Sequence, residues 1–284
     1  MFIYGDIMNH NQQKKIALIN DYTGFGRCSI SVSLPIISKM KIQCCPLPTS
    51  IFSNHTGYDS HFCFDFTKYM KSYMEEWIKL DLRFNGILTG YLGSLEQIRF
   101  VLEFIDQFKK ENTLVIVDPV MGDNGKIYKN YSKEMTENMY KLIQKADIIT
   151  PNLTEACILC NMNYKEDWTE KEIETIARKL AQMGPDKVVI TGMCKEDSIY
   201  NYYHQTNDSG WIQTKRMGIS RAGTGDLFSS IIAADAIHGV SFEQSILKAT
   251  HFISKCIEKA IEMDIPYRDG GPFEEVLDEL QEEL

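Results

Sequence analysis

The sequence predicts an α/β protein with a central, mostly parallel sheet and helices on both faces. Short apolar segments alternate with helix-length segments along the 284 residues, and each apolar segment ends in a polar or glycine-containing loop. Strands that are apolar along their whole length belong in a sheet covered on both sides, as parallel sheets are. No repeat or low-complexity linker divides the chain, so we expect one domain over residues 1–284, with residues 1–14 as a flexible extension.

The alternation gives the order of the elements. Five strands are predicted at residues 15–20, 86–90, 114–120, 146–152 and 187–192. Six helices are predicted at residues 29–40, 94–110, 132–145, 169–183, 225–238 and 242–263. Residues 42–62 interrupt this pattern and favour an edge hairpin or a flap, and residues 198–217 favour two strands joined by a turn. The acidic C-terminal tail predicts a short amphipathic helix.

Composition and charge exclude several classes of function. The net charge of −9 repels nucleic acid and anionic membranes. The chain has neither a run of about 18 apolar residues nor a signal-peptide pattern, so we expect a cytoplasmic protein with no membrane contact. The eight cysteines are scattered, which favours free thiols. Cys157 and Cys160 have redox or zinc spacing, but they are better explained as core residues of an amphipathic helix.

The segment Ala222-Gly223-Thr224-Gly225-Asp226 precedes a long apolar run that reaches Gly239. The first turn of a helix has unpaired N–H groups and a partial positive charge, and glycines let a ligand approach the backbone closely. The segment therefore predicts a phosphate site. Asp226 could simply cap the helix. Beside a phosphate, however, a carboxylate can also accept the proton of an attacking hydroxyl group.

This segment also carries a family resemblance. "GTGDLFSS" (223–230) resembles the C-terminal signature of the ribokinase-like superfamily. Five further segments resemble, in order, those of pyridoxal kinases: "FSNHTGY" (52–58), "TGYLGS" (89–94), "DPVMGDNGKIY" (118–128), "ITPNLTEACIL" (149–159) and "MGPDKVVITG" (183–192). The match extends over residues 16–259. It implies a three-layer ribokinase-like fold and ATP-dependent phosphorylation of the 5′-hydroxymethyl group of vitamin B6 compounds.

The resemblance assigns the catalytic residues. It implies that Asp226 is the catalytic base and contacts the substrate hydroxyl group. Gly223, Thr224 and Gly225 would hold the γ-phosphate of ATP through their backbone N–H groups. Because phosphoryl-transfer transition states are loose, an ordinary carboxylate is basic enough for this role.

The resemblance also places Asp118 and Glu155 near Mg²⁺, with Glu155 acting through water, and Asn152 near the phosphates. Mg²⁺ prefers oxygen ligands and keeps several waters, so one or two carboxylates are adequate. Asn152 could instead be only a helix N-cap. Thr150 and Thr191 match ATP-binding positions, although a threonine that bonds its own backbone at a strand end is an equal alternative.

On the substrate side the resemblance implies roles for Asp21, Thr49, Phe52 and Tyr91. Thr49 would bond the pyridine ring and Phe52 would stack on it, whereas Tyr91 could either line the site or pack in the core. Many pyridoxal kinases have a serine where this chain has Asp21. A carboxylate only accepts hydrogen bonds when ionised, so this difference leaves open the choice among pyridoxal, pyridoxine and pyridoxamine.

Other functions remain as alternatives. A hydroxymethylpyrimidine kinase of thiamine synthesis shares the fold and the glycine loop, and an enzyme that accepts both rings is also open. A non-catalytic nucleotide or vitamin sensor would be expected to lack the carboxylate that Asp226 supplies. A dehydrogenase is disfavoured because no G-x-G-x-x-G follows the first strand. The expected cofactors are ATP and Mg²⁺, with a monovalent cation such as K⁺ left open, and the resemblance implies a homodimer.

Overall fold

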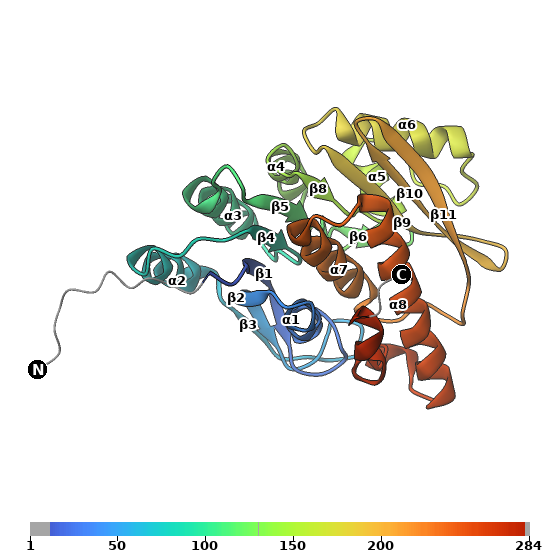
Figure 1. The fold of residues 1–284 in the computed structure, drawn as a ribbon, viewed down its shortest axis with the longest axis horizontal. Coiled ribbons are helices and arrows are strands. Elements are labelled where there is room, and N and C mark those ends of the chain that lie inside the picture. Colours follow the sequence, from blue (N-terminus) through green and yellow to red (C-terminus); the bar gives the residue numbers. More distant parts are fainter. Residues whose placement is uncertain (1–11, 130, 282–284) are drawn as a thin grey trace, which may run out of the picture.

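The computed structural model describes residues 12–129 and 131–281. Most of the predicted extension at residues 1–14 therefore lies outside the described residues. A nine-stranded sheet runs through the molecule in the order β11-β10-β9-β8-β5-β4-β1-β2-β3 (Figure 1). Its strands are β1 (Lys15–Thr23), β2 (Gln43–Phe52), β3 (Cys63–Asp65), β4 (Gly86–Thr89), β5 (Leu114–Val117), β8 (Ile148–Ile149), β9 (Lys187–Lys195), β10 (Ser198–Gln205) and β11 (Asp208–Lys215).

The middle of the sheet is parallel, from β2 through β1, β4, β5 and β8 to β9. The antiparallel strands are at the edges, with β3 on β2 and the β10–β11 hairpin on β9. Each central strand alternates its side chains between two cores. Ala17 and Ile19 of β1 face one core, whereas Ile16 and Leu18 face the other. This alternation is what a sheet buried on both faces requires.

Helices cover both faces and complete three layers, as predicted. One core is closed by α2 (Thr67–Lys79), α3 (Leu95–Phe108), α4 (Lys133–Ile143), α5 (Leu153–Leu159) and α6 (Glu170–Ala181). The other is closed by α1 (Ile30–Lys39), α7 (Thr224–His238), α8 (Phe242–Glu262) and the 3₁₀ helix η2 (Phe273–Gln281). The predicted strands and helices are all present. The expected C-terminal amphipathic helix is present as η2, which buries Phe273 and Leu280.

The region that broke the sequence pattern contains a full strand. β2 runs parallel to β1 over most of its length, and β3 pairs with it only at Ser50–Phe52. Pro46 and Pro48 therefore lie on a stretch with a single ladder, where the lost N–H groups cost no bond to a second strand. The expected hairpin is limited to this β2–β3 pair, and the loop of residues 53–62, called the flap below, connects the two strands.

Candidate active site

An open cleft of about 2270 Å³ follows the carboxyl ends of the parallel strands and reaches the start of α7. Ligands bind at this edge in open α/β sheets because the loops there converge from neighbouring strands. The cleft is lined by all but one of the residues that the sequence singled out, namely Asp21, Phe52, Tyr91, Asp118, Thr150, Asn152, Glu155, Thr191, Gly223, Thr224, Gly225 and Asp226. The exception is Thr49.

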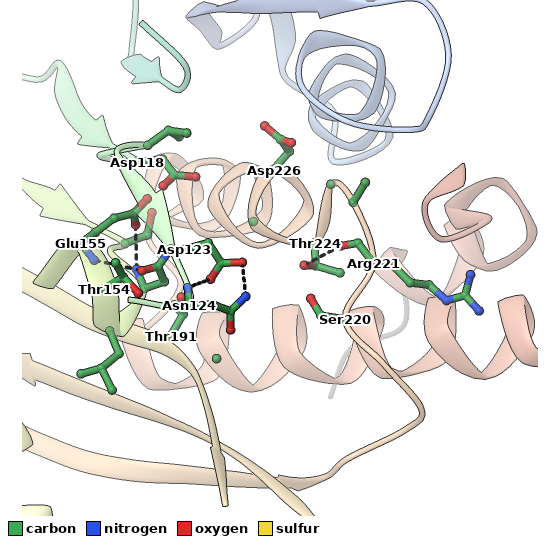
Figure 2. A pocket seen from close by; sticks show the side chains of 18 of the residues that line it. Asp118, Asp123, Asn124, Thr154, Glu155, Thr191, Ser220, Arg221, Thr224 and Asp226 are labelled. Atoms are coloured by element: carbon green, nitrogen blue, oxygen red, sulfur yellow. Dashed lines mark hydrogen bonds between the residues drawn. The ribbon is translucent and has the colours of Figure 1, made fainter. Parts of the chain in front are cut away.

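The start of α7 forms the predicted anion site. Gly223 is the N-cap residue and has a φ of 80°, in the left-handed region. A Cβ at this position would lie 2.0 Å from the carbonyl oxygen of Arg27, so only glycine fits. The hydroxyl group of Thr224 donates to the Arg221 carbonyl at 3.3 Å, which closes the turn (Figure 2). The first N–H groups of α7 are therefore presented toward the cleft on a tightly held loop.

Asp226 lies in the first turn of α7, where it is half-buried. Burial raises its pKa to about 6, against the opposing effect of hydrogen bonds from the Ser29 amide and the Asn20 side chain. The charge of Asp21 adds to the rise. A carboxylate whose pKa lies slightly below neutral is ionised at pH 7 and is still a better proton acceptor than an exposed aspartate.

Asn20 holds this carboxylate, a role that the sequence reading missed. Its Nδ2 donates to Asp226 Oδ1 at 3.1 Å, and its Oδ1 accepts from the amides of Tyr91 at 2.8 Å and Asp21 at 2.9 Å. A Cβ on Gly90 would lie 2.4 Å from the Asn20 amide group, so Gly90 makes room for it. The available signal was a buried asparagine that follows the apolar residues of the first strand.

Asp118 directly follows β5 and is 9% exposed. Burial and the charge of Asp226 together raise its pKa to about 8. Its Oδ2 lies 3.7 Å from the point where Gly225 would carry a Cβ, so the carboxylate faces the first turn of α7. Figure 2 shows Asp118 beside Glu155, on the strand side of this turn. A cation bound beside these two carboxylates would stabilise the ionised form of both.

Asn152 and Glu155 form a capping box at the start of α5. The Asn152 side chain accepts from the Glu155 amide at 3.0 Å, and Glu155 Oε2 accepts from the Asn152 amide at 2.9 Å. Glu155 Oε1 accepts from the Met121 amide at 3.1 Å, and Asn152 Nδ2 donates to the Gly122 carbonyl at 2.9 Å. The N-cap alternative for Asn152 is therefore observed. Burial, with the charge of Asp118, raises the pKa of Glu155 well above its usual range.

These acidic groups suit Mg²⁺ as a phosphate-bound ion. Among residues 12–129 and 131–281 there is no group of three or more His, Cys, Asp or Glu side chains that could hold a metal ion. Both oxygens of Glu155 are bound by backbone amides, which leaves water-mediated contact as its natural mode. Asp118 offers a buried carboxylate without a basic partner in the described ion pairs. Mg²⁺ keeps several waters and is commonly held by one or two carboxylates together with phosphates.

The two threonines differ in how they are bonded. Thr150, after β8, has a buried Oγ1 with no partner within the described residues. Thr191 Oγ1 lies 3.5 Å from the Pro151 carbonyl, at the limit for a hydrogen bond, while its amide bonds the same carbonyl at 2.9 Å. An unpaired buried hydroxyl group is costly, so Thr150 gains from a polar ligand at this wall.

The opposite end of the cleft is aromatic. Phe52 packs edge-on against Tyr91, with ring centroids 6.1 Å apart, and against His61 at 5.6 Å. Tyr91 lines the cleft and is not a core residue. Thr49 lies behind this wall. It is fully buried and its hydroxyl group donates to the Tyr91 carbonyl at 3.0 Å, so in this structure it supports Tyr91 and does not face the cleft.

The flap is fastened to a C-terminal segment, residues 265–271, which we call the strap. Tyr58 donates to Asp269 Oδ1 at 2.6 Å, and His55 Nε2 lies 2.6 Å from the Arg268 carbonyl. The strap also accepts from Arg221 Nη1 at the Ile265 carbonyl, at 2.8 Å. Arg221 immediately precedes the glycine loop, and its guanidinium group points away from Thr224 and Asp226 toward the strap (Figure 2). The flap and the glycine loop are thus tied to one segment of the chain.

Two further predictions concern the cysteines and membrane-spanning helices. All eight cysteines are free, and Cys157 is buried in the core of α5, as expected for a core residue. None of the described helices is long and apolar enough to cross a membrane.

Comparison with known proteins identifies the family. The family model described as phosphomethylpyrimidine kinase matches residues 34–269. The chain belongs to the phosphomethylpyrimidine kinase family.

Solved structures of the family show the same fold. A protein from Bacteroides thetaiotaomicron, assigned to the phosphomethylpyrimidine kinases, is 39% identical with a TM-score of 0.95, covering 98% of this chain and 97% of that one. A second crystal form of that protein contains pyridoxal and gives 38% identity and a TM-score of 0.93, with coverage of 96% and 97%.

Similar proteins also include pyridoxal kinases. Pyridoxal kinase PdxY of Vibrio vulnificus is 28% identical over 244 residues, which is 81% of this chain and 82% of that protein. These similarities confirm the resemblance to pyridoxal kinases and the three-layer ribokinase-like fold.

Proposed function

We propose that this protein is an ATP-dependent kinase that phosphorylates the 5′-hydroxymethyl group of B6 vitamers and so recovers pyridoxal 5′-phosphate. One observation carries the proposal. A single cleft places Asp226 and the N-terminus of α7 between an aromatic end and an acidic, threonine-lined end. A small ring at the aromatic end and a nucleotide tail at the other would meet at Asp226. The pyridoxal in the Bacteroides thetaiotaomicron relative supports this choice of ring.

Each residue then has a task in the transfer. The N–H groups at Gly223, Thr224 and Gly225 stabilise the negative charge on the transferring phosphoryl group. Asp226, oriented by Asn20, accepts the proton of the attacking hydroxyl group. Phe52 and the flap cover the ring and limit the access of water, which would otherwise compete as the acceptor.

ATP and Mg²⁺ are the proposed cofactors. Asp118 and Glu155 would hold Mg²⁺, Glu155 through water, and the bound ion would neutralise charge on the phosphates. Thr150, Asn152 and Thr191 would lie along the nucleotide. A requirement for K⁺ is tested by titrating monovalent salts into the ADP-release assay described below.

Hydroxymethylpyrimidine phosphorylation is the second candidate, because the matching family model is described as phosphomethylpyrimidine kinase, an activity on the phosphorylated form of the same pyrimidine. The deciding experiment measures ADP release with ATP and Mg²⁺ in the presence of pyridoxal, pyridoxine, pyridoxamine or hydroxymethylpyrimidine. We expect turnover with at least one B6 vitamer. Exclusive turnover of the pyrimidine would replace the proposal with the second candidate, and no turnover of any of the four would favour a sensor.

Two properties of the whole protein complete the proposal. We propose a homodimer in the cytoplasm. Analytical ultracentrifugation of the full chain at micromolar concentration tests the first part, with a mass near twice 32.7 kDa expected. Fractionation of the source cells tests the second.

A further inference from the structure

Asp21 is a buried carboxylate at the substrate end of the cleft. It is 5% exposed and lines the cleft together with Phe52 and Tyr91. Its Oδ1 accepts from the Ser29 hydroxyl group and its Oδ2 from the Thr23 hydroxyl group, each at 2.7 Å. Both donors are neutral and offset only part of the cost of burying a charge. Each carboxylate oxygen keeps a further site for a hydrogen bond.

None of the ion pairs in the described chain includes Asp21, whose carboxylate is bonded by hydroxyl groups. The Lys and Arg residues of the described chain that line the cleft are Lys129, Lys195 and Arg221. Arg27 is near in sequence, but it pairs with Glu274 at 2.9 Å and does not line the cleft. Arg221 lines the cleft, but its guanidinium donates to the strap carbonyls of Ile265 and Pro266.

Two histidines also line the cleft: His61 packs on Phe52, and His55 is hydrogen-bonded to backbone groups through both ring nitrogens. Its Nδ1 accepts from the Gly57 amide at 3.0 Å, which leaves the proton on Nε2 for the Arg268 carbonyl at 2.6 Å. A second acid, Asp226, shares this end of the cleft. The cleft therefore has a buried carboxylate, Asp21, near a half-buried one, Asp226, and a ligand with a positive charge would be stabilised there while a neutral or anionic one would not.

We infer that Asp21 binds a cationic N–H group of the substrate and thereby selects for it. The inference rests on the proposed function. Two positions of a B6 vitamer can carry such a group, the protonated ring nitrogen and the exocyclic ammonium group of pyridoxamine. In either case the charged N–H donates to a free lone pair of the Asp21 carboxylate, and the Ser29 and Thr23 hydroxyl groups hold that carboxylate in place.

The test compares kcat/KM for pyridoxal, pyridoxine and pyridoxamine in the wild type, Asp21→Asn and Asp21→Ser. We expect kcat/KM to fall at least about tenfold in both variants, mainly through a higher KM, because a hydrogen bond to a charged group is removed. A loss for all three vitamers assigns the ring nitrogen, and a loss confined to pyridoxamine assigns the exocyclic amine. Values within twofold of the wild type for all three overturn the inference. Asp81→Asn is the matched control, since it removes an acid from an exposed turn.

Two further measurements keep the outcome decisive. With the unmodified enzyme, we expect one of two results. Either kcat/KM for a benzene analogue of pyridoxine, which lacks the ring nitrogen, is at least about tenfold below that for pyridoxine, or kcat/KM for pyridoxamine is at least about tenfold above it. If neither holds, the inference falls even where the variants do not fold. Calorimetric binding separates the two proposals. A wild type that binds a vitamer without phosphorylating it contradicts the proposed function alone, equal binding by Asp21→Asn contradicts the inference alone, and a wild type that binds no vitamer contradicts both.

Discussion

Asp226 and Asp118 carry pKa values of about 6 and about 8, well above the ordinary value of 3.8. A raised pKa means that the folded protein favours the protonated acid more than the unfolded chain does. At neutral pH each such group therefore lowers the free energy of unfolding. The burial that makes Asp226 a good proton acceptor thus also lowers the stability of the folded protein.

The substitution Asp226→Asn tests this cost. It keeps the shape and an oxygen that can accept from Asn20, and it removes the half-buried charge. We expect the ligand-free protein to gain up to about 3 kcal/mol of stability at pH 7, because the pKa rises by about two units. Urea unfolding measures the change. A variant less stable than the wild type would show that the ionised carboxylate stabilises the fold.

Gly223 and Gly239 offer a second test, since they stand at the two ends of α7 with φ values of 80° and 83°. A Cβ at Gly223 would meet the Arg27 carbonyl at 2.0 Å, whereas a Cβ at Gly239 would meet nothing within 4 Å. We expect Gly239→Ala to cost about 1 kcal/mol from backbone strain and Gly223→Ala at least about 2 kcal/mol more. Equal costs in urea unfolding would mean that the glycine loop relaxes freely around the added methyl group.

Sequence reading located individual residues unevenly. The glycine loop was predicted because its chemistry is local, within four consecutive residues. Asn20 was missed because its partners, Asp226 and the Tyr91 amide, are far along the chain, and nothing in a single asparagine indicates them. Thr49 was expected in the site, but its hydroxyl group bonds the Tyr91 carbonyl. The two-residue alternation of a strand predicts which face of the sheet a side chain is on. It does not predict whether that side chain lines a cleft or lies behind the residues that line it.

Among the elements, the flap and the strap depend on each other. The Tyr58–Asp269 hydrogen bond joins them directly, at 2.6 Å. We expect Tyr58→Phe to raise KM for the B6 substrate about three- to tenfold with little change in kcat, because one net hydrogen bond that holds the flap is lost. Steady-state kinetics measures both constants. Tyr69→Phe, on exposed α2 beside Phe64, is the matched control. An unchanged KM would mean that the flap is held without the strap.

Regular elements were predictable where the apolar spacing was strong, as in α7 and in the central strands. For residues 42–62 the sequence predicts an edge hairpin or a flap, because this segment interrupts the alternation of apolar strands and helices. Most of it is the strand β2, which tolerates its two prolines where it has a single partner. The helix α2 was not predicted. It buries only Met70 and Met74, and Tyr73 and Trp77 are partly buried against the same core. A helix at the rim of a core, with few fully buried residues, is harder to find in a single sequence.

On the scale of the whole molecule, the acids in the cleft make stability depend on pH. Between pH 5 and 8 the folded protein retains protons on Asp118 and Asp226 that the unfolded chain has lost, so the free energy of unfolding falls as pH rises. The lowered pKa of His204 acts in the opposite direction. We therefore expect Asp226→Asn to flatten the pH dependence of the melting temperature in this range. A slope equal to that of the wild type would assign the effect to other groups.

Bound ligands should reverse this cost. The Mg²⁺ ion that binds with ATP would place positive charge beside the acids, and the ligand binds only the folded state, so we expect the melting temperature to rise with ligand concentration. The rise should be smaller in Asp118→Asn than in the matched surface variant Asp81→Asn. Differential scanning fluorimetry measures it. Equal shifts in both variants would remove Asp118 from the site for the nucleotide and its metal.

The family and the three-layer fold were predictable from the order of several short motifs along the chain, most of which lie where a parallel strand ends. The departures from the family pattern, above all Asp21, required coordinates, because their meaning depends on which charges surround them in space.

The central claim is that Asp226 takes the proton from a substrate hydroxyl group held against the phosphate site of α7. Rapid-quench single turnover of pyridoxal with saturating ATP and Mg²⁺ measures the transfer step itself, in the wild type and in Asp226→Asn. We predict that the variant binds both substrates and transfers the phosphoryl group about 10²- to 10⁴-fold more slowly. A transfer rate within threefold of the wild type would contradict the claim.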